Sequence, residues 1–138
     1  HYDRLFITRN NTRYRHLINE QQVLELLNAY GFKKIEVDSM TVYEQAQLFS
    51  SAKAVVAPHG AGLTNLVFCN PGTKVIELFS SHYWNSCFAI ISNHCRLDYY
   101  YIIGEGYPRP NHEWGALAED MVVDLNDLSA TLRLAGIS

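Results

Sequence analysis

The segment Ala57–Leu78, with the sequence APHGAGLTNLVFCNPGTKVIEL, sets a polar turn between two apolar stretches. The stretches at 52–58 and 73–79 are continuous apolar runs, which predicts two buried strands. Between them, residues 59–65 include two glycines, a histidine and an asparagine. A turn needs one or two glycines, so His59 and Asn65 require a further explanation.

Strand-like and helix-like segments alternate along the rest of the chain. Strands are predicted at 4–8, 33–38, 52–58, 73–79 and 97–105, with a short sixth strand at 120–125. Helices are predicted at 20–30, 42–51, 63–69, 83–95 and 128–137. The strands are continuous apolar runs rather than alternating ones, which indicates burial on both faces. The pattern predicts a Rossmann-like three-layer α/β domain, in which helices cover both faces of a mostly parallel sheet.

Capping residues support several of these helices. The expected helix starts are Asn19 with Gln22, Thr41 with Glu44, and either Asn126 or Asp127. Gly31 is expected to end the first helix. Trp84 and Phe88 lie on an apolar stripe that predicts the helix at 83–95.

The composition limits the classes of function. The chain has 138 residues, 48% of them hydrophobic, and a net charge of −3. Its length fits one domain over 1–138, and the abrupt start in a strand predicts a fragment of a longer protein. The charge argues against nucleic acid as a partner, because phosphate backbones select basic surfaces. We expect no membrane-spanning segment, because the longest apolar runs are too short to cross a bilayer.

The three cysteines and one sequon bear on the compartment. Cys69, Cys87 and Cys95 have no metal-binding spacing, and an odd count is typical of a reducing compartment. Asn10 begins a formal glycosylation acceptor, but the loop that holds it is expected to face a ligand. These observations favour a cytoplasmic protein.

The polar residues fall where a ligand should bind. In parallel sheets, ligands bind beyond the carboxyl ends of the strands. Gly60 and Gly62 would let the backbone bend sharply and approach a ligand. The helix that follows would direct free amides at a phosphate, to which His59, Thr64 or Asn65 could also bond. The alternative is a tight strand-to-helix turn with a locally bonded His59.

Two further groups of residues point to the same edge. Arg9, Arg13 and Arg15 follow the first strand, and arginine side chains match diphosphate oxygens. A charge run is often only a solvated loop, but its place beside the glycine turn favours binding by Arg9 and Arg13. Glu77, near the end of the fourth strand, is the type of residue that bonds ribose hydroxyls.

No catalytic residue can be assigned from the pattern. Asp98 and Glu105 are possible acids or bases, but nothing in the sequence gives either a partner. The remaining histidines lack metal-ligand spacing and are expected on the surface or in helices; they are His16, His82, His94 and His112. We expect no metal site and no cofactor.

The segment 57–79, APHGAGLTNLVFCNPGTKVIELF, closely resembles the signature block of glycosyltransferase family 61. The segments RLFITRNNTRYRHLINEQQVLELLNAYGFKKIEV at 4–37, MTVYEQAQLFSSAKAVV at 40–56 and VVDLNDLSATL at 122–132 resemble other parts of the family. The resemblance therefore covers nearly the whole chain.

This resemblance implies a donor-binding half of a two-domain GT-B glycosyltransferase. Such enzymes move a sugar with inversion from a nucleotide-sugar, commonly a UDP-sugar, to a glycan or polysaccharide acceptor. The residues carried over as donor contacts are Arg9, Arg13, His59, Gly60, Ala61, Gly62 and Glu77. Bacterial relatives act in surface polysaccharide synthesis, in the cytoplasm, whereas a eukaryotic relative would work in the Golgi or ER lumen. The catalytic base stays unassigned.

Two other functions stay open. A non-catalytic nucleotide-binding or interaction module could keep the same fold. An NAD-type dinucleotide-binding domain is less favoured, because the glycine turn follows the third strand and Asn65 replaces the third glycine of the fingerprint.

Overall fold

The computed structural model describes residues 2–9, 16–107 and 119–138. Its main sheet has five strands in the order β2-β1-β3-β4-β5, and every neighbouring pair is parallel. The strands are β1 (Arg4–Ile7), β2 (Lys33–Ile35), β3 (Ala54–Pro58), β4 (Lys74–Phe79) and β5 (Asp98–Ile103). Their carboxyl ends therefore share one edge, which is where the sequence predicts the ligand.

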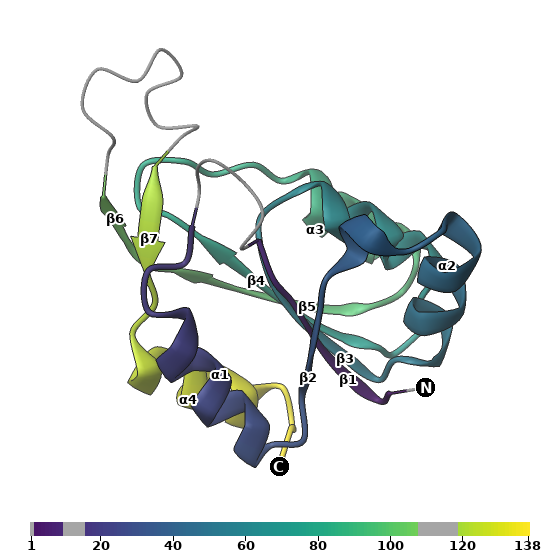
Figure 1. Ribbon diagram of the computed structural model, residues 1–138, viewed down its shortest axis with the longest axis horizontal. Coiled ribbons are helices and arrows are strands. Elements are labelled where there is room, and N and C mark those ends of the chain that lie inside the picture. The colour runs from purple at the N-terminus through teal and green to yellow at the C-terminus, as the bar shows by residue number, and fades with distance from the viewer. Residues whose placement is uncertain (1, 10–15, 108–118) are drawn as a thin grey trace.

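Helices cover both faces of this sheet (Figure 1). One face carries α1 (Glu20–Ala29) and α4 (Leu125–Leu134), and the other carries α2 (Val42–Ser51) and α3 (Cys87–His94). Two 3₁₀ helices, η1 (Val37–Ser39) and η2 (Ala61–Phe68), complete the second layer. The predicted Rossmann-like three-layer fold is confirmed.

The continuous apolar strands are explained by this sandwich. Successive residues of a strand face opposite sides of the sheet. Phe6 and Val56 pack in the core beneath α1 and α4, whereas Leu5 and Val55 pack beneath α2 and η2. All four side chains are fully buried. Both faces must therefore be apolar, which removes the alternation expected of a half-exposed strand.

The sixth predicted strand exists but does not join the main sheet. It forms β7 (Asp120–Val122), which pairs antiparallel with β6 (Glu105–Tyr107) in a separate two-stranded sheet. Met121 at its centre also bridges to Leu17 ahead of α1. This hairpin follows β5, so it lies at the carboxyl edge of the main sheet.

The capping predictions have mixed outcomes. Thr41 and Glu44 form the reciprocal capping box at the start of α2, as predicted. The box predicted at Asn19 is wrong, because its amide bonds both the N–H and the C=O of Val123 instead. The last helix is capped by Asp124 rather than by the two predicted residues. The partner of Asn19 is set by tertiary position, which a local motif does not contain, whereas the Asp124 cap is local and lies two residues before the first of the predicted positions.

Two other local predictions differ from the structure. The fourth helix begins at Cys87, so Trp84 lies outside it and is 60% exposed rather than in the core. The segment after the glycine turn is a 3₁₀ helix that already begins at Ala61. Gly31, with φ of 79°, ends α1 as predicted.

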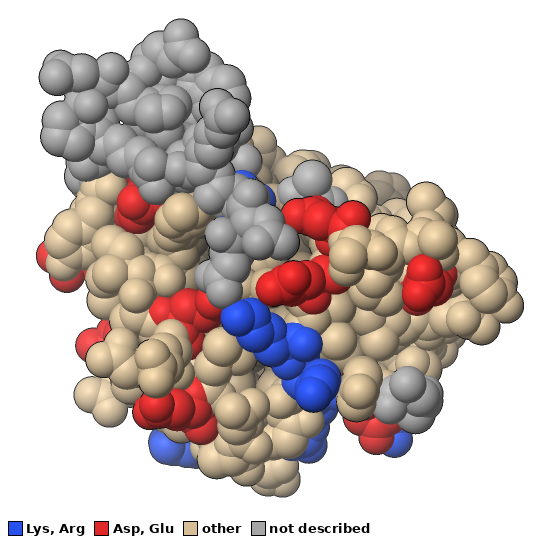
Figure 2. Space-filling model, in the orientation of Figure 1, with Lys and Arg blue, Asp and Glu red and all other residues tan. Residues whose placement is uncertain are grey.

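The surface carries charges of both signs. On the face drawn in Figure 2, a short row of basic side chains is flanked by acidic ones. Among the described residues, Lys34 and Glu20 form an ion pair at 3.7 Å. Among the described side chains of this face there is no broad basic region of the kind that binds nucleic acid. Within the described residues, no helix has both the length and the apolarity needed to span a bilayer.

Candidate functional site

A small cavity lies at the carboxyl edge of the sheet, between β1, β3 and η1. Its volume is about 200 Å³. Its lining is Ile7, Thr8, Arg9, Val37, Asp38, Ala57, Pro58, Gly60, Gly62 and Leu63. Sites for whole drug-sized ligands are roughly 300–1,000 Å³, so this cavity suits part of a ligand, such as a diphosphate.

A larger hollow of about 660 Å³ lies at the opposite edge, near Lys53 and Lys74. It is formed at the amino ends of β1, β3 and β4. Because parallel sheets bind ligands at their carboxyl ends, the smaller cavity is the stronger candidate.

Arg9 and Gly60 are in contact inside this cavity. A Cβ atom placed on Gly60 would lie only 1.8 Å from Nη1 of Arg9. The φ angle of Gly60 is 169°, which is extended backbone that any residue can adopt. The glycine is therefore required for space rather than for the sharp bend that the sequence suggested. The structure thus brings Arg9 and the glycine turn together, as predicted.

The other predicted donor contacts are distributed unevenly. Arg13 lies outside the described residues, as does the side chain of Ala61. Thr64 is exposed on η2. Asn65 is buried and braces the turn, because its Nδ2 donates to Gln45 Oε1 at 2.7 Å and to the Gly62 carbonyl at 3.0 Å. The binding roles of these residues stay predictions.

His59 belongs to a buried polar network that crosses three strands. Its Nδ1 lies 2.5 Å from Oε2 of Glu77, and the Tyr99 hydroxyl donates to Oε1 of Glu77 at 2.5 Å. Glu77 is fully buried on β4, while His59 follows β3 and Tyr99 lies on β5. We assign Nδ1 of His59 as a donor, because the carboxylate accepts from both neighbours.

The surroundings fix this network in place. The His59 ring stacks on Phe79 at 5.3 Å between centroids and meets Tyr83 and Phe88 at 5.3 and 5.1 Å. The pKa of the Tyr99 phenol is raised above its ordinary value, mainly by burial and secondly by the hydrogen bond to Glu77. Tyr99 therefore stays a hydrogen-bond donor at working pH.

Glu77 is placed differently from the sequence interpretation. It lies near the end of β4, as predicted, but it is fully buried and both of its oxygens are already bonded to protein groups. A direct ribose contact stays a prediction, and it would require the carboxylate to leave one of these partners. In the described arrangement Glu77 orients His59.

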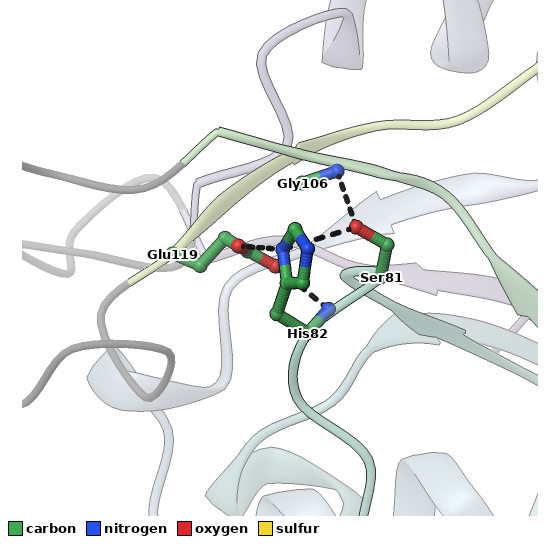
Figure 3. A network of polar contacts seen from close by, with 4 residues as sticks. All are labelled: Ser81, His82, Gly106 and Glu119. Carbon is green, nitrogen blue, oxygen red and sulfur yellow. Dashed lines mark hydrogen bonds and ion pairs between the residues drawn. The ribbon is translucent and has the colours of Figure 1, made fainter.

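A second histidine–carboxylate pair lies just after β4 (Figure 3). Nδ1 of His82 is 2.6 Å from Oε2 of Glu119, and the His82 backbone N–H donates to Oε1 at 3.0 Å. The carboxylate is fully buried, whereas the imidazole is 64% exposed. A Cβ on Gly106 would lie 2.1 Å from this carboxylate, so β6 can pass over it only as glycine.

Ser81 completes this network but does not make it a catalytic triad. Its Oγ accepts from the Gly106 N–H at 3.1 Å and lies 3.3 Å from Nδ1 of His82. Ser81 and Glu119 thus contact the same ring nitrogen. A histidine that relays a proton from serine uses its two different nitrogens. The arrangement consequently does not support a serine nucleophile.

The ionisation of Glu119 stabilises the fold in a pH-dependent way. Burial opposes its charge, but hydrogen bonds from Ser80 and His82 outweigh burial and lower the pKa of the Glu119 carboxyl from its ordinary 4.5. A lowered folded-state pKa adds stability above the unfolded value, and this contribution is lost as the pH falls through the folded value.

We therefore expect Glu119→Gln to lose stability relative to the parent near neutral pH, with a difference that shrinks in acid. The measurement is the free energy of unfolding in urea at several pH values from about 7 to about 3, which brackets ordinary carboxyl titration. Glu25→Gln, at an exposed position of α1, is the control and should show a small, flat difference. A Glu119 difference that is equally flat would contradict the expectation.

Sequence reasoning missed most of these supporting groups. His82 was expected to be an ordinary surface or helix residue, and Glu119 drew no attention. The two residues are 37 positions apart, so no local motif indicates that they form a pair. The one available signal was the pair of glycines at 104 and 106, directly after the predicted fifth strand, which indicates a close backbone approach.

Comparisons with known proteins identify the family of the chain. Residues 1–76 match the family described as Glycosyltransferase 61. The chain is 39% identical over 94 residues to Beta-1,2-xylosyltransferase RCN11 of Oryza sativa subsp. japonica, covering 62% of this chain and 18% of that protein. It is 27% identical over 97 residues to Beta-1,2-xylosyltransferase of Arabidopsis thaliana, covering 61% and 18%.

The alignments thus span under a fifth of the length of either relative. The family match includes the Arg9–Gly60 contact and His59, and it ends just before Glu77. It covers more than half of the 138 residues. Together with the confirmed fold, this match establishes that the chain belongs to the Glycosyltransferase 61 family.

Proposed function

We propose that this chain is the donor-binding part of an inverting glycosyltransferase. It would bind a nucleotide-sugar, with a UDP-sugar as the first candidate, and supply the sugar to a glycan acceptor such as a polysaccharide. In the GT-B arrangement that the family resemblance implies, a second Rossmann-like half would hold the acceptor. The observation that carries the proposal is the contact of Arg9 with Gly60 at the carboxyl edge of a parallel sheet.

The chemistry at this edge suits a diphosphate leaving group. Negative charge grows on the diphosphate as the bond to the sugar breaks, and fixed donors in a sheltered cavity stabilise it. Arg9 supplies a permanent positive charge with several N–H donors. The first amides of η2 lie beside it, since η2 begins directly after Gly60. These groups can neutralise the leaving group without a metal ion, so the proposal includes no cofactor.

His59 would act beside the leaving group. Its Nδ1 is held by Glu77, which fixes the plane of the ring. A hydrogen bond from Nε2 to a phosphate oxygen would need both ring nitrogens to carry protons, because Nδ1 stays on Glu77. Tyr99 supports this arrangement from β5 by holding the other carboxylate oxygen.

The relatives bear on the compartment and the donor sugar. The two relatives are plant proteins whose names state transfer of xylose in a β-1,2 linkage. We therefore favour the Golgi or ER lumen over the cytoplasm that the cysteine count suggested. Xylose is the first donor sugar to try.

A thermal-shift panel tests the proposal. A ligand that binds only the folded state at about 100 times its Kd raises stability by roughly 2.7 kcal/mol. We expect UDP, or another nucleoside diphosphate, to raise the melting temperature, and NAD to leave it unchanged. Stabilisation by NAD alone would favour the dinucleotide-binding alternative, and no response to any nucleotide would contradict a donor site. Sugar transfer by the full chain that carries this sequence then separates an enzyme from a non-catalytic nucleotide-binding module.

A further inference from the structure

The His82 imidazole is exposed, yet hydrogen bonds to a buried carboxylate hold it in one orientation. Three hydrogen-bonding groups converge on the buried Glu119 carboxylate: the His82 ring, the His82 backbone N–H and the Ser80 side chain. The hairpin strand β6 closes over the same carboxylate at Gly106 (Figure 3). A buried carboxylate and a fixed backbone thus orient one ring that faces solvent.

The orientation decides which ring nitrogen is reactive. Nδ1 points to the Glu119 carboxylate, at 2.6 Å, and donates its proton there. In the neutral ring the lone pair is then on Nε2. The His82 side chain is 64% exposed and its Nδ1 faces the buried carboxylate, so we infer that Nε2 is the nitrogen open to a molecule outside the protein. This is the tautomer that a general base needs.

His82 lies at the carboxyl edge of the sheet, as does the 200 Å³ cavity proposed to bind the donor, but it is farther along this edge. Its neighbour Tyr83 packs edge-on against His59, which directly precedes Gly60 of the cavity. In strand order, Arg9 follows β1 and His82 follows β4, two strand spacings away. Neighbouring strands are about 4.8 Å apart, so the strand ends are separated by roughly 10 Å. A sugar attached to a diphosphate in the cavity can extend across this gap.

An inverting transfer requires this separation. The acceptor oxygen attacks the anomeric carbon from the side opposite the leaving phosphate, so the base and the phosphate-binding groups must flank the sugar. Asp98 and Glu105, the bases considered from the sequence, are less suitable. Asp98 is paired with Lys74 at the amino end of β5, away from the cavity. Glu105 lies on β6 and is exposed, and its side-chain hydrogen bond is to Tyr107 of the same strand rather than to a buried group that would fix it as Glu119 fixes His82.

We propose that His82 is the general base of the transfer and that Glu119 is its positioning residue. This inference rests on the proposed function. Nε2 of His82 takes the proton from the acceptor hydroxyl while that oxygen forms its bond to the anomeric carbon. The bond from that carbon to the phosphate oxygen breaks, and its electron pair leaves with the diphosphate. The imidazolium keeps Nδ1–H on Glu119 and releases the new proton from Nε2 to solvent.

The decisive variant is His82→Asn, because an asparagine amide can keep a donor at the position of Nδ1 but has no atom equivalent to Nε2. In the full chain that carries this sequence, we expect transfer to an acceptor to fall by about 10²–10⁴-fold. Affinity for the nucleoside diphosphate and the melting temperature should stay close to those of the parent. His94→Asn, at an exposed histidine on the last turn of α3, is the matched control and should transfer normally.

The pH dependence gives a second readout. An imidazole base acts only when neutral, so the parent should lose kcat as the pH falls, and His82→Asn should lack this limb. The charged group in direct contact with the ring is Glu119, and two further carboxylates, Glu105 and Asp120, lie on the strands of the covering hairpin, where Glu105 bonds Tyr107 and Asp120 accepts from the His16 N–H. Glu119→Gln should lower kcat by at least about tenfold with little change in KM, because the amide no longer selects the reactive tautomer. An unchanged kcat in that variant would remove the positioning role.

The outcomes separate this inference from the proposed function. Normal transfer by His82→Asn would overturn the inference while leaving donor binding and sugar transfer intact. Failure of the parent to bind any nucleotide or to transfer any sugar would overturn the proposed function, and the inference with it. If His82→Asn also lost nucleotide affinity, the hairpin pairing rather than catalysis would be its role, and the inference would fail.

Discussion

Replacing Glu77 by alanine is expected to lower the free energy of unfolding by about 3–5 kcal/mol, because breaking a buried charged pair leaves its partner without compensation. Glu77 has no exposed surface and accepts hydrogen bonds from two side chains. Alanine would leave Nδ1 of His59 and the hydroxyl of Tyr99 without an acceptor, in a region closed by aromatic rings. A cavity in place of the side chain adds to the loss.

Urea denaturation of the isolated chain measures this change. Glu77→Gln keeps the volume and one acceptor oxygen, so we expect a smaller loss than for alanine. Asp98→Ala is the control, because its ion pair with Lys74 is partly exposed and such pairs contribute at most about 1 kcal/mol. Equal losses in Glu77→Ala and Asp98→Ala would mean that the buried network contributes no more than a surface pair.

Replacing Arg9 by alanine is expected to weaken nucleoside diphosphate binding by about 1.5–3 kcal/mol, the usual range for a hydrogen bond to a charged group. This corresponds to a rise in Kd of about 10–150-fold. The fold should persist, because Arg9 follows β1 rather than lying within it. Isothermal titration with UDP measures the affinity.

Gly60→Ala tests the same contact without removing the charge. Its added Cβ would overlap the Arg9 guanidinium, so the arginine must leave its place in the cavity. We expect an affinity loss that approaches that of Arg9→Ala, and little further loss in the double variant. Arg133→Ala, at an exposed arginine on the last turn of α4, is the matched control. If Arg9→Ala and Arg133→Ala bound UDP equally well, Arg9 would have no role at the diphosphate.

The layered fold was predictable from the sequence because its determinants are local. A strand buried on both faces reads as an unbroken apolar run, as at Val55 and Val56. The capping box at Thr41 needs only a residue three positions away. The meeting of Arg9 with Gly60 followed from one rule, that carboxyl ends of parallel strands share an edge.

The rest depended on contacts between distant positions. Asn19 has the sequence of a cap, but Val123 lies close enough to use both of its side-chain groups. Glu77 was interpreted as a ligand contact because its burial beneath His59 is visible only after β3, β4 and β5 are aligned. The partner of His82 is 37 residues away, beyond a segment with no regular pattern. Pairing at such distances is set by tertiary structure alone.

The side-chain hydrogen bonds from His59 to Glu77 and from Tyr99 to Glu77 also link β3, β4 and β5, in addition to the backbone hydrogen bonds between these strands. These strands therefore tend to open as one cooperative unit, which amide hydrogen exchange would detect as a shared slow rate. By contrast, β2 pairs over only three residues at the other edge and can open separately. A nucleotide held at His59 would consequently protect amides as far away as β5, a remote signature of occupancy.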